Sequence, residues 1–72
     1  MPVQQQRRRL GEAIRARRKE AGLTQEKLAE RADLSPVFIS HIECGIGNAS
    51  FDTLVRIANA LGVRLRELVA DI

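Results

Sequence analysis

Hydrophobic residues recur at helical spacing in five segments of the chain, which capping residues and glycines separate. The first segment, about 6–21, has an apolar side made of Leu10, Ala13, Ile14 and Ala21. This spacing is typical of an amphipathic helix. Gly22 follows it, where a left-handed C-terminal residue belongs. Residues 1–6 are polar overall and lack periodicity, so we expect them to form a frayed lead-in.

The next two segments are short and lie almost end to end. Thr24 can cap a helix whose apolar side is made of Leu28, Ala29 and Ala32. Asp33-Leu34 forms the link, and aspartate tolerates the left-handed conformation better than most non-glycine residues. Ser35 then caps a helix that ends at Gly45, with Pro36 in the first helical position, where a missing N–H costs nothing. We expect the inward side of this helix to contain Ile39, Ile42 and, in part, Phe38.

Residues 46–49 are predicted to form a loop, after which Ser50 caps a fourth helix. Its apolar stripe is the strongest in the chain: Phe51, Leu54, Ile57, Ala58 and Leu61. We expect Phe51, Leu54 and Ile57 to be core residues; the alternative is that part of this stripe meets a second subunit. Gly62-Val63 is typical of a Schellman end, and a short fifth helix is expected over about 64–70. No segment shows sustained strand alternation, so the predicted fold is all-α, a compact five-helix domain.

Chain length and cysteine content narrow the class of protein. The 72 residues fit one domain, and we expect 1–72 to form it, with an ordered core at about 6–70. Cys44 is the single cysteine and His41 the single histidine, too few for an internal disulfide or a metal site. We expect no cofactor. No signal-peptide h-region or membrane-length apolar run occurs, which favours a cytoplasmic protein.

Basic side chains gather at one end of the chain. The net charge is +3, but residues 1–19 carry seven basic side chains against one acidic, Glu12. Residues 20–72 carry five basic and eight acidic side chains. A basic end on a small domain suggests a polyanion partner such as nucleic acid, although a solvated helix face would give the same charge pattern.

The two short helices that begin after Thr24 and Ser35 form a known supersecondary motif. A pair joined by a tight turn, the second one capped, is a helix-turn-helix. In such motifs the first helix crosses the DNA backbone and the second lies in the major groove. The stretch LTQEKLAERADLSPVFISHIECG, followed by SFDTLVRIANALGV, resembles the helix-turn-helix domain of the lambdoid phage repressor, Cro and XRE family. The resemblance extends over roughly Leu10 to Val69 and implies a lambda-repressor-like five-helix fold that binds double-stranded DNA, usually as a homodimer on a palindromic operator.

The resemblance also implies roles for individual positions. Base contacts would come from the start of the third helix and the turn after it: Ser35, Pro36, Val37, Ser40 and His41. Backbone contacts would come from the start of the second helix and the loop after the third: Thr24, Gln25, Gly45, Ile46, Gly47 and Asn48. Arg18 and Glu43 match a structural ion pair of the family.

Several positions depart from the family pattern. At position 33 the family usually has glycine, and this chain has Asp33. At position 17 it usually has an apolar residue, and this chain has Arg17. Cys44 stands where the family often has a basic or amide side chain, and Arg64 stands where it often has a side chain that caps a helix. The outer side of the third helix also lacks Arg, Lys, Gln and Asn, the residues that pair with guanine or adenine through two hydrogen bonds. We therefore expect modest specificity per half-site, with help from DNA shape and dimer symmetry.

Some side chains have a plainer alternative. His41 could be an ordinary exposed histidine instead of a base or phosphate contact, or a pH switch. Cys44 could be a redox sensor, but a small residue near a helix end is the simpler interpretation. The three arginines of residues 7–9 could clamp the DNA backbone, although the first helix starts away from the groove in many family members.

The function that follows is sequence-specific transcriptional regulation, by a small homodimeric repressor or autoregulator of bacterial, archaeal or phage origin. We expect no ligand-sensing or oligomerisation domain after Ile72, so control would come from protein concentration, a partner protein or proteolysis. A restriction–modification controller and an antitoxin-type repressor both fit this description. No small-molecule ligand is expected. The alternative is a protein-interaction module that keeps the fold without binding DNA. An enzyme is not expected, because no paired acid and base, activated nucleophile or phosphate-cradling glycine loop occurs.

Overall fold

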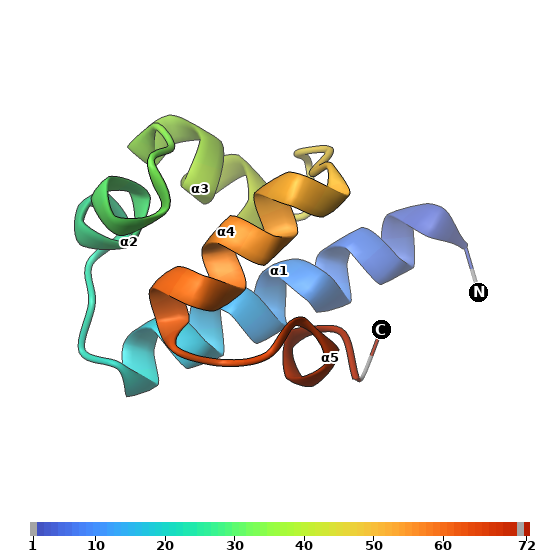
Figure 1. Ribbon diagram of the computed structural model, residues 1–72. Coiled ribbons are helices and arrows are strands. Elements are labelled where there is room, and N and C mark those ends of the chain that lie inside the picture. The colour runs from blue at the N-terminus through green and yellow to red at the C-terminus, as the bar shows by residue number, and fades with distance from the viewer. Residues whose placement is uncertain (1, 71) are drawn as a thin grey trace.

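A computed structural model of the chain describes residues 2–70 and 72. These residues contain five helices and no strand (Figure 1). The all-α prediction is therefore confirmed. In chain order the helices are α1 (Val3–Glu20), α2 (Gln25–Ala32), α3 (Pro36–Glu43), α4 (Phe51–Leu61) and α5 (Leu65–Leu68).

Helix α1 begins earlier than the hydrophobic pattern indicated. It starts at Val3, with Pro2 in an extended conformation before it, so the expected frayed lead-in was wrong for residues 3–6; Met1 lies outside the described residues. The reason is tertiary: Gln4 Nε2 donates a hydrogen bond of 2.9 Å to the carbonyl oxygen of Gly45. A contact across 41 residues of sequence holds the first turn in place, and no local periodicity could reveal it. Helix α5 is also shorter than the predicted 64–70.

The predicted caps are present at three helix starts. The hydroxyls of Thr24, Ser35 and Ser50 accept hydrogen bonds from the backbone N–H three residues later. Each such cap is worth about 1 kcal/mol over alanine. Because these caps stop α2, α3 and α4 from extending backward, they also fix where the three preceding connections end.

The core is formed by side chains from all five helices, and α4 packs on α2. Its largest fully buried side chains are Ile14, Leu28, Ile39, Ile57 and Leu68, one from each helix. Helix α3 packs on both α1 and α2, and α5 packs on α4 and α1. This packing holds the α2–α3 pair at the edge of the molecule, with one side of α3 left to solvent.

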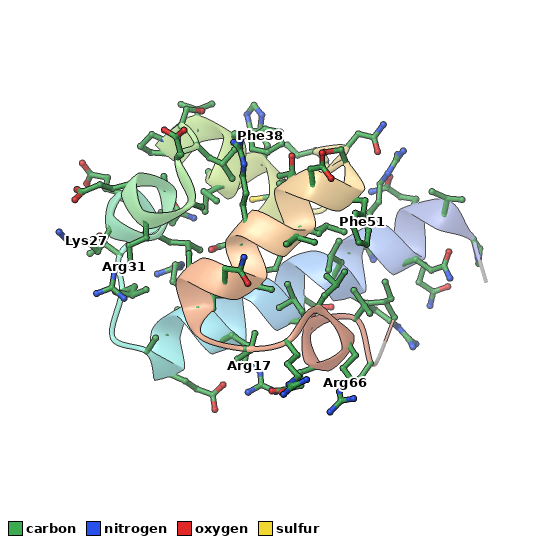
Figure 2. All side chains as sticks on the ribbon, viewed as in Figure 1. Arg17, Lys27, Arg31, Phe38, Phe51 and Arg66 are labelled. Atoms are coloured by element: carbon green, nitrogen blue, oxygen red, sulfur yellow. The ribbon has the colours of Figure 1, made fainter. Side chains whose placement is uncertain are left out.

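Phe51 was wrongly predicted to be a core residue. Ile57 is buried and Leu54 packs against the core, but Phe51 is 68% exposed. Figure 2 shows its side chain at the first turn of α4. A helix start lies at the margin of the packed layer, so a residue on the correct side of the helix can still lie beyond the neighbouring helices.

Candidate nucleic-acid interface

A three-residue turn joins α2 to α3. Asp33 adopts the left-handed conformation with φ 58°, as its sequence position suggested. The N–H of Leu34 donates to the carbonyl oxygen of Ala29 over 2.8 Å, which closes the end of α2. Ser35 then caps α3 by accepting from the Phe38 N–H at 3.1 Å. Hydrogen bonds on both sides of the turn therefore fix the angle between the helices.

The outward side of α3 is open to solvent. Val37 is 63% exposed, Ser35, Pro36 and His41 are exposed, and Ser40 is half-buried. The structure thus brings the five predicted base-reading residues together on one accessible surface. The Ser35 hydroxyl accepts a cap bond, but its own O–H stays available as a donor.

The inward side of α3 is held by a buried ion pair. Arg18 Nε donates to Glu43 Oε2 at 2.7 Å, and Arg18 Nη2 donates to Glu43 Oε1 at 3.1 Å. Arg18 Nη1 also donates to the Leu23 carbonyl oxygen at 2.9 Å. The two side chains are only 11% and 2% exposed. This fork-to-fork geometry is the strong form of the arginine–carboxylate contact, and it ties α1 to the end of α3.

The hydrogen bonds from Arg18 to Glu43 raise the pKa of the guanidinium above its ordinary value, with a further contribution from the negative charge of Glu43, while burial acts in the opposite direction. A raised pKa stabilises the fold below the ordinary arginine pKa, and that contribution is lost only as the pH rises through the raised value. The Arg18 guanidinium is therefore charged at neutral pH.

Gln25 joins this network from the start of α2. Its Nε2 donates to Glu43 Oε1 at 3.1 Å. Because a carboxylate can only accept, this bond orients the amide and leaves one N–H and the amide oxygen for another partner. Thr24 beside it accepts from the Lys27 N–H at 3.0 Å and keeps its own O–H. Two polar donors thus stand side by side next to the C-terminal end of α3.

The loop after α3 uses most of its N–H groups internally. The Gly45 N–H donates to the Ile42 carbonyl oxygen, and those of Ile46 and Gly47 both donate to the His41 carbonyl oxygen, at 3.0 to 3.2 Å. Of the four predicted backbone-contact positions in this loop, exposed Asn48 is the one whose N–H has no acceptor among the described residues. Sequence reasoning could not find this difference, since it depends on how the loop folds back.

The departures from the family pattern have simple structural outcomes. Arg17 lies on the α5 side of α1 (Figure 2), where its Nη2 is 3.9 Å from Glu67 Oε2 and both side chains remain partly exposed. Arg64 precedes α5 without a side-chain cap, as expected for arginine. Cys44 is exposed at the C-cap of α3.

Among residues 2–70 and 72, no helix is both long and apolar enough to cross a membrane. The same residues hold no group of three or more His, Cys, Asp or Glu side chains placed to share a metal ion.

A capped helix that faces solvent on a bracing helix is the geometry with which helix-turn-helix proteins enter a DNA groove. The fold and the solvent-facing side of α3 together define a helix-turn-helix domain. Comparison with known proteins agrees: residues 14–68 match the family model described as helix-turn-helix. The chain belongs to the XRE-type helix-turn-helix family.

Similar proteins include repressors and controllers. The immunity repressor protein of Bacillus phage phi105 is 42% identical over 62 residues, which are 86% of this chain and 43% of the repressor. The control protein C.BamHI of Bacillus amyloliquefaciens is 40% identical over 60 residues, 82% of this chain and 74% of that protein. The crystal structure of the restriction-modification controller protein C.AhdI from Aeromonas hydrophila matches with a TM-score of 0.85 at 32% identity, covering 86% of this chain and 94% of that one. The chain thus spans less than half the length of the phage repressor.

Proposed function

We propose that this protein regulates transcription as a small homodimeric repressor or autoregulator that places α3 in the major groove of a palindromic operator. The observation that carries the proposal is the solvent-facing side of α3, which is braced from behind by the buried Arg18–Glu43 pair. A rigid brace matters because a reading helix must present its side chains at a fixed distance from the base edges.

The proposed base contacts are weak individually. Val37 would meet a thymine methyl group, while Ser35, Ser40 and His41 would each form single hydrogen bonds, and Pro36 would set the start of the helix. None of these side chains offers the two-bond match to guanine or adenine that is worth about 1–3 kcal/mol of discrimination. Specificity would then depend on DNA shape and on two half-sites read together.

The proposed backbone contacts lie on both sides of α3. On one side, Thr24 and Gln25 would donate to a phosphate through the hydrogens that the cap and the Glu43 contact leave unused. On the other side, the loop Gly45–Asn48 would approach a phosphate, chiefly through Asn48. Phosphate contacts fix the register of a protein on the duplex, so these groups would set how α3 enters the groove.

Double-stranded operator DNA as the partner implies further features of the proposal. Residues 1–72 would act as one DNA-binding domain. The domain would regulate by binding DNA, without catalysing a reaction, and would do so in the cytoplasm, where operator DNA lies. Homodimers of this kind bind half-sites about one helical turn, roughly 34 Å, apart. The names of the relatives, an immunity repressor and two controller proteins, support regulation of this type.

The test is an electrophoretic shift of a palindrome library at two salt concentrations. DNA binding through phosphates gives a steep salt slope, because every neutralised phosphate releases counterions. A slope near zero would reject the proposal and favour a protein-interaction module that keeps the fold.

Variants then assign the roles. We expect Gln25→Ala to weaken binding to every sequence to a similar degree, since phosphate contacts carry no base information. Val37→Ala and His41→Ala should instead change which sequences are selected. Val3→Ala is the matched control, because Val3 is 61% exposed against 63% for Val37 but lies at the start of α1. Unchanged selection by both α3 variants would show that the reading surface is elsewhere.

A further inference from the structure

One side of α1 lies along the end of α3 and the loop that follows it. Residues 4, 8, 11, 15 and 18 are spaced three or four apart, so their side chains share a face of the helix. At its C-terminal end this face holds Arg18, which contacts Glu43. In its middle, a Cβ atom added to Gly11 would lie 2.6 Å from the Glu43 carbonyl oxygen. The α1 backbone therefore touches the α3 backbone directly.

The N-terminal part of this face touches the loop. Gln4 Nε2 donates to the Gly45 carbonyl oxygen at 2.9 Å, and a Cβ atom added to Gly45 would lie 3.0 Å from the Arg8 Cα. Arg8 thus emerges from the point where the loop and α1 are in backbone contact. Gly45 has φ +77°, a conformation that favours glycine, and its missing side chain permits this approach.

The Arg8 side chain is free to reach a partner. Arg8 is exposed, and among the described residues no carboxylate oxygen lies within salt-bridge distance of its guanidinium. Glu12, one turn later on the helix, forms no ion pair with it there. The exposed outer side of α3 ends at Cys44, immediately before Gly45. A cation at this position borders the surface that α3 presents.

We propose that Arg8 is a DNA-backbone contact that extends the phosphate-binding loop, and that Gln4 is a positioning residue that holds Arg8 there. The inference rests on the proposed function and adds a residue to it. The loop brings few free N–H groups and no charge of its own, because residues 45–48 are Gly, Ile, Gly and Asn. Arg8 supplies that charge, and its planar guanidinium suits a phosphate with two acceptor oxygens.

Arg9 provides a matched control in the same helix. It is also exposed, and removal of either charge changes the net charge equally. On an α-helix its side chain is turned about 100° from that of Arg8, away from the face that touches the loop. A general attraction between the basic end of the chain and DNA would depend equally on both arginines, whereas a local phosphate contact depends on Arg8 alone.

The experiment measures binding of the full chain to a mixed-sequence DNA duplex at several salt concentrations, for the unaltered protein, Arg8→Gln and Arg9→Gln. We expect Arg8→Gln to reduce the slope of log affinity against log salt by about 0.9 for each protomer bound, and Arg9→Gln to leave it unchanged. Gln4→Ala should give a smaller reduction in the same direction. Glutamine matches arginine in helix propensity, and circular dichroism would verify that each variant remains folded.

The outcomes separate the two proposals. Salt-dependent binding that is equally affected, or equally unaffected, by Arg8→Gln and Arg9→Gln overturns the role of Arg8 and leaves the proposed function in place. A salt slope near zero for the unaltered protein overturns both. A loss of thermal stability in Arg8→Gln without a change in slope would assign Arg8 a structural role instead.

Discussion

At the scale of single residues, the fold depends on one buried charge with its partner. As whole residues, backbone included, Arg18 and Glu43 are 9% and 8% exposed. A charge this deeply buried is tolerated only when it is paired and hydrogen-bonded. Among the described residues, no buried side-chain nitrogen or oxygen lacks a hydrogen-bond partner. The pair joins α1 to α3, and Gln25 connects it to α2, so three helices meet at one carboxylate.

Glu43→Leu should lower the free energy of unfolding by about 3–5 kcal/mol, because the Arg18 guanidinium would remain buried without a counter-charge. The double variant Arg18→Met with Glu43→Leu should recover most of that loss, since apolar side chains can replace a buried ion pair at little cost. Urea denaturation at neutral pH measures both values. Gln25→Ala is the control, because it removes only the hydrogen bond from Gln25 to Glu43 and leaves the ion pair in place. A double variant as unstable as the single one would show that the pair itself is not the source of the effect.

At the scale of elements, the position of α3 is set by how closely α1 approaches it. Gly11 is buried in the middle of α1, where glycine weakens a helix by about 1 kcal/mol relative to alanine. Glycine is needed at this position because the backbone of α3 occupies the space that a side chain on residue 11 would take. The reading helix is therefore positioned by backbone contact and by an ion pair, both from α1.

Gly11→Ala tests this contact because helix propensity and packing predict opposite signs. Propensity alone would raise stability by about 1 kcal/mol, whereas a crowded Cβ should lower it by about 1–3 kcal/mol. We expect the decrease, measured by thermal or urea unfolding. Ala16→Gly, at an exposed position of the same helix, is the control and should cost about 1 kcal/mol. Higher stability in Gly11→Ala would mean that α1 and α3 are not in such close contact.

At the scale of the whole molecule, the exposed apolar side chains need an explanation. Phe51 and Ile46 are each 68% exposed, on α4 and on the loop before it. A large aromatic ring on the surface is often part of an interface. The proposed homodimer would bury such a ring through an isologous contact, in which both protomers use the same residues.

Phe51→Ser should leave the free energy of unfolding of the monomer within about 0.5 kcal/mol, as is usual for exposed positions. It should weaken dimerisation by at least about tenfold, because burying a phenylalanine is worth about 1.5–3 kcal/mol and 1.4 kcal/mol is a factor of ten. Sedimentation at several protein concentrations measures the dimer. Val37→Ser is the control, being 63% exposed on the α3 surface. Equal dimer affinity of the Phe51→Ser and Val37→Ser variants would show that Phe51 is not part of the dimer interface.

Local signals predicted much of the fold correctly. Three side-chain caps, the left-handed Asp33 and the proline at the start of α3 each act within about four residues, so their chemistry is visible in the sequence. The buried Ile14, Ile39 and Ile57 followed from helical periodicity. The resemblance to the family placed Arg18 and Glu43 together, and the ion pair is present.

Other features became visible only from contacts between distant segments. The start of α1 depends on the bond from Gln4 to Gly45, the exposure of Phe51 depends on where its neighbours end, and the free donors of the loop depend on how it folds back on His41. The proximity of Arg8 to the loop belongs to this group. A stripe shared by Gln4, Arg8, Gly11 and Arg18 could have suggested it, but the stripe does not say which helix it meets.

The sequence by itself determined the number of helices, their caps and the tight turn before α3, because each follows from backbone preferences or from helical periodicity over a few residues. The outward position of Val37 and His41 was implied by the resemblance to the family. Only the tertiary structure decided which parts of α1 touch α3 and its loop, where the core ends and which polar groups remain unpaired. Those properties depend on distances between segments far apart in the chain, and a one-dimensional pattern contains no such distances.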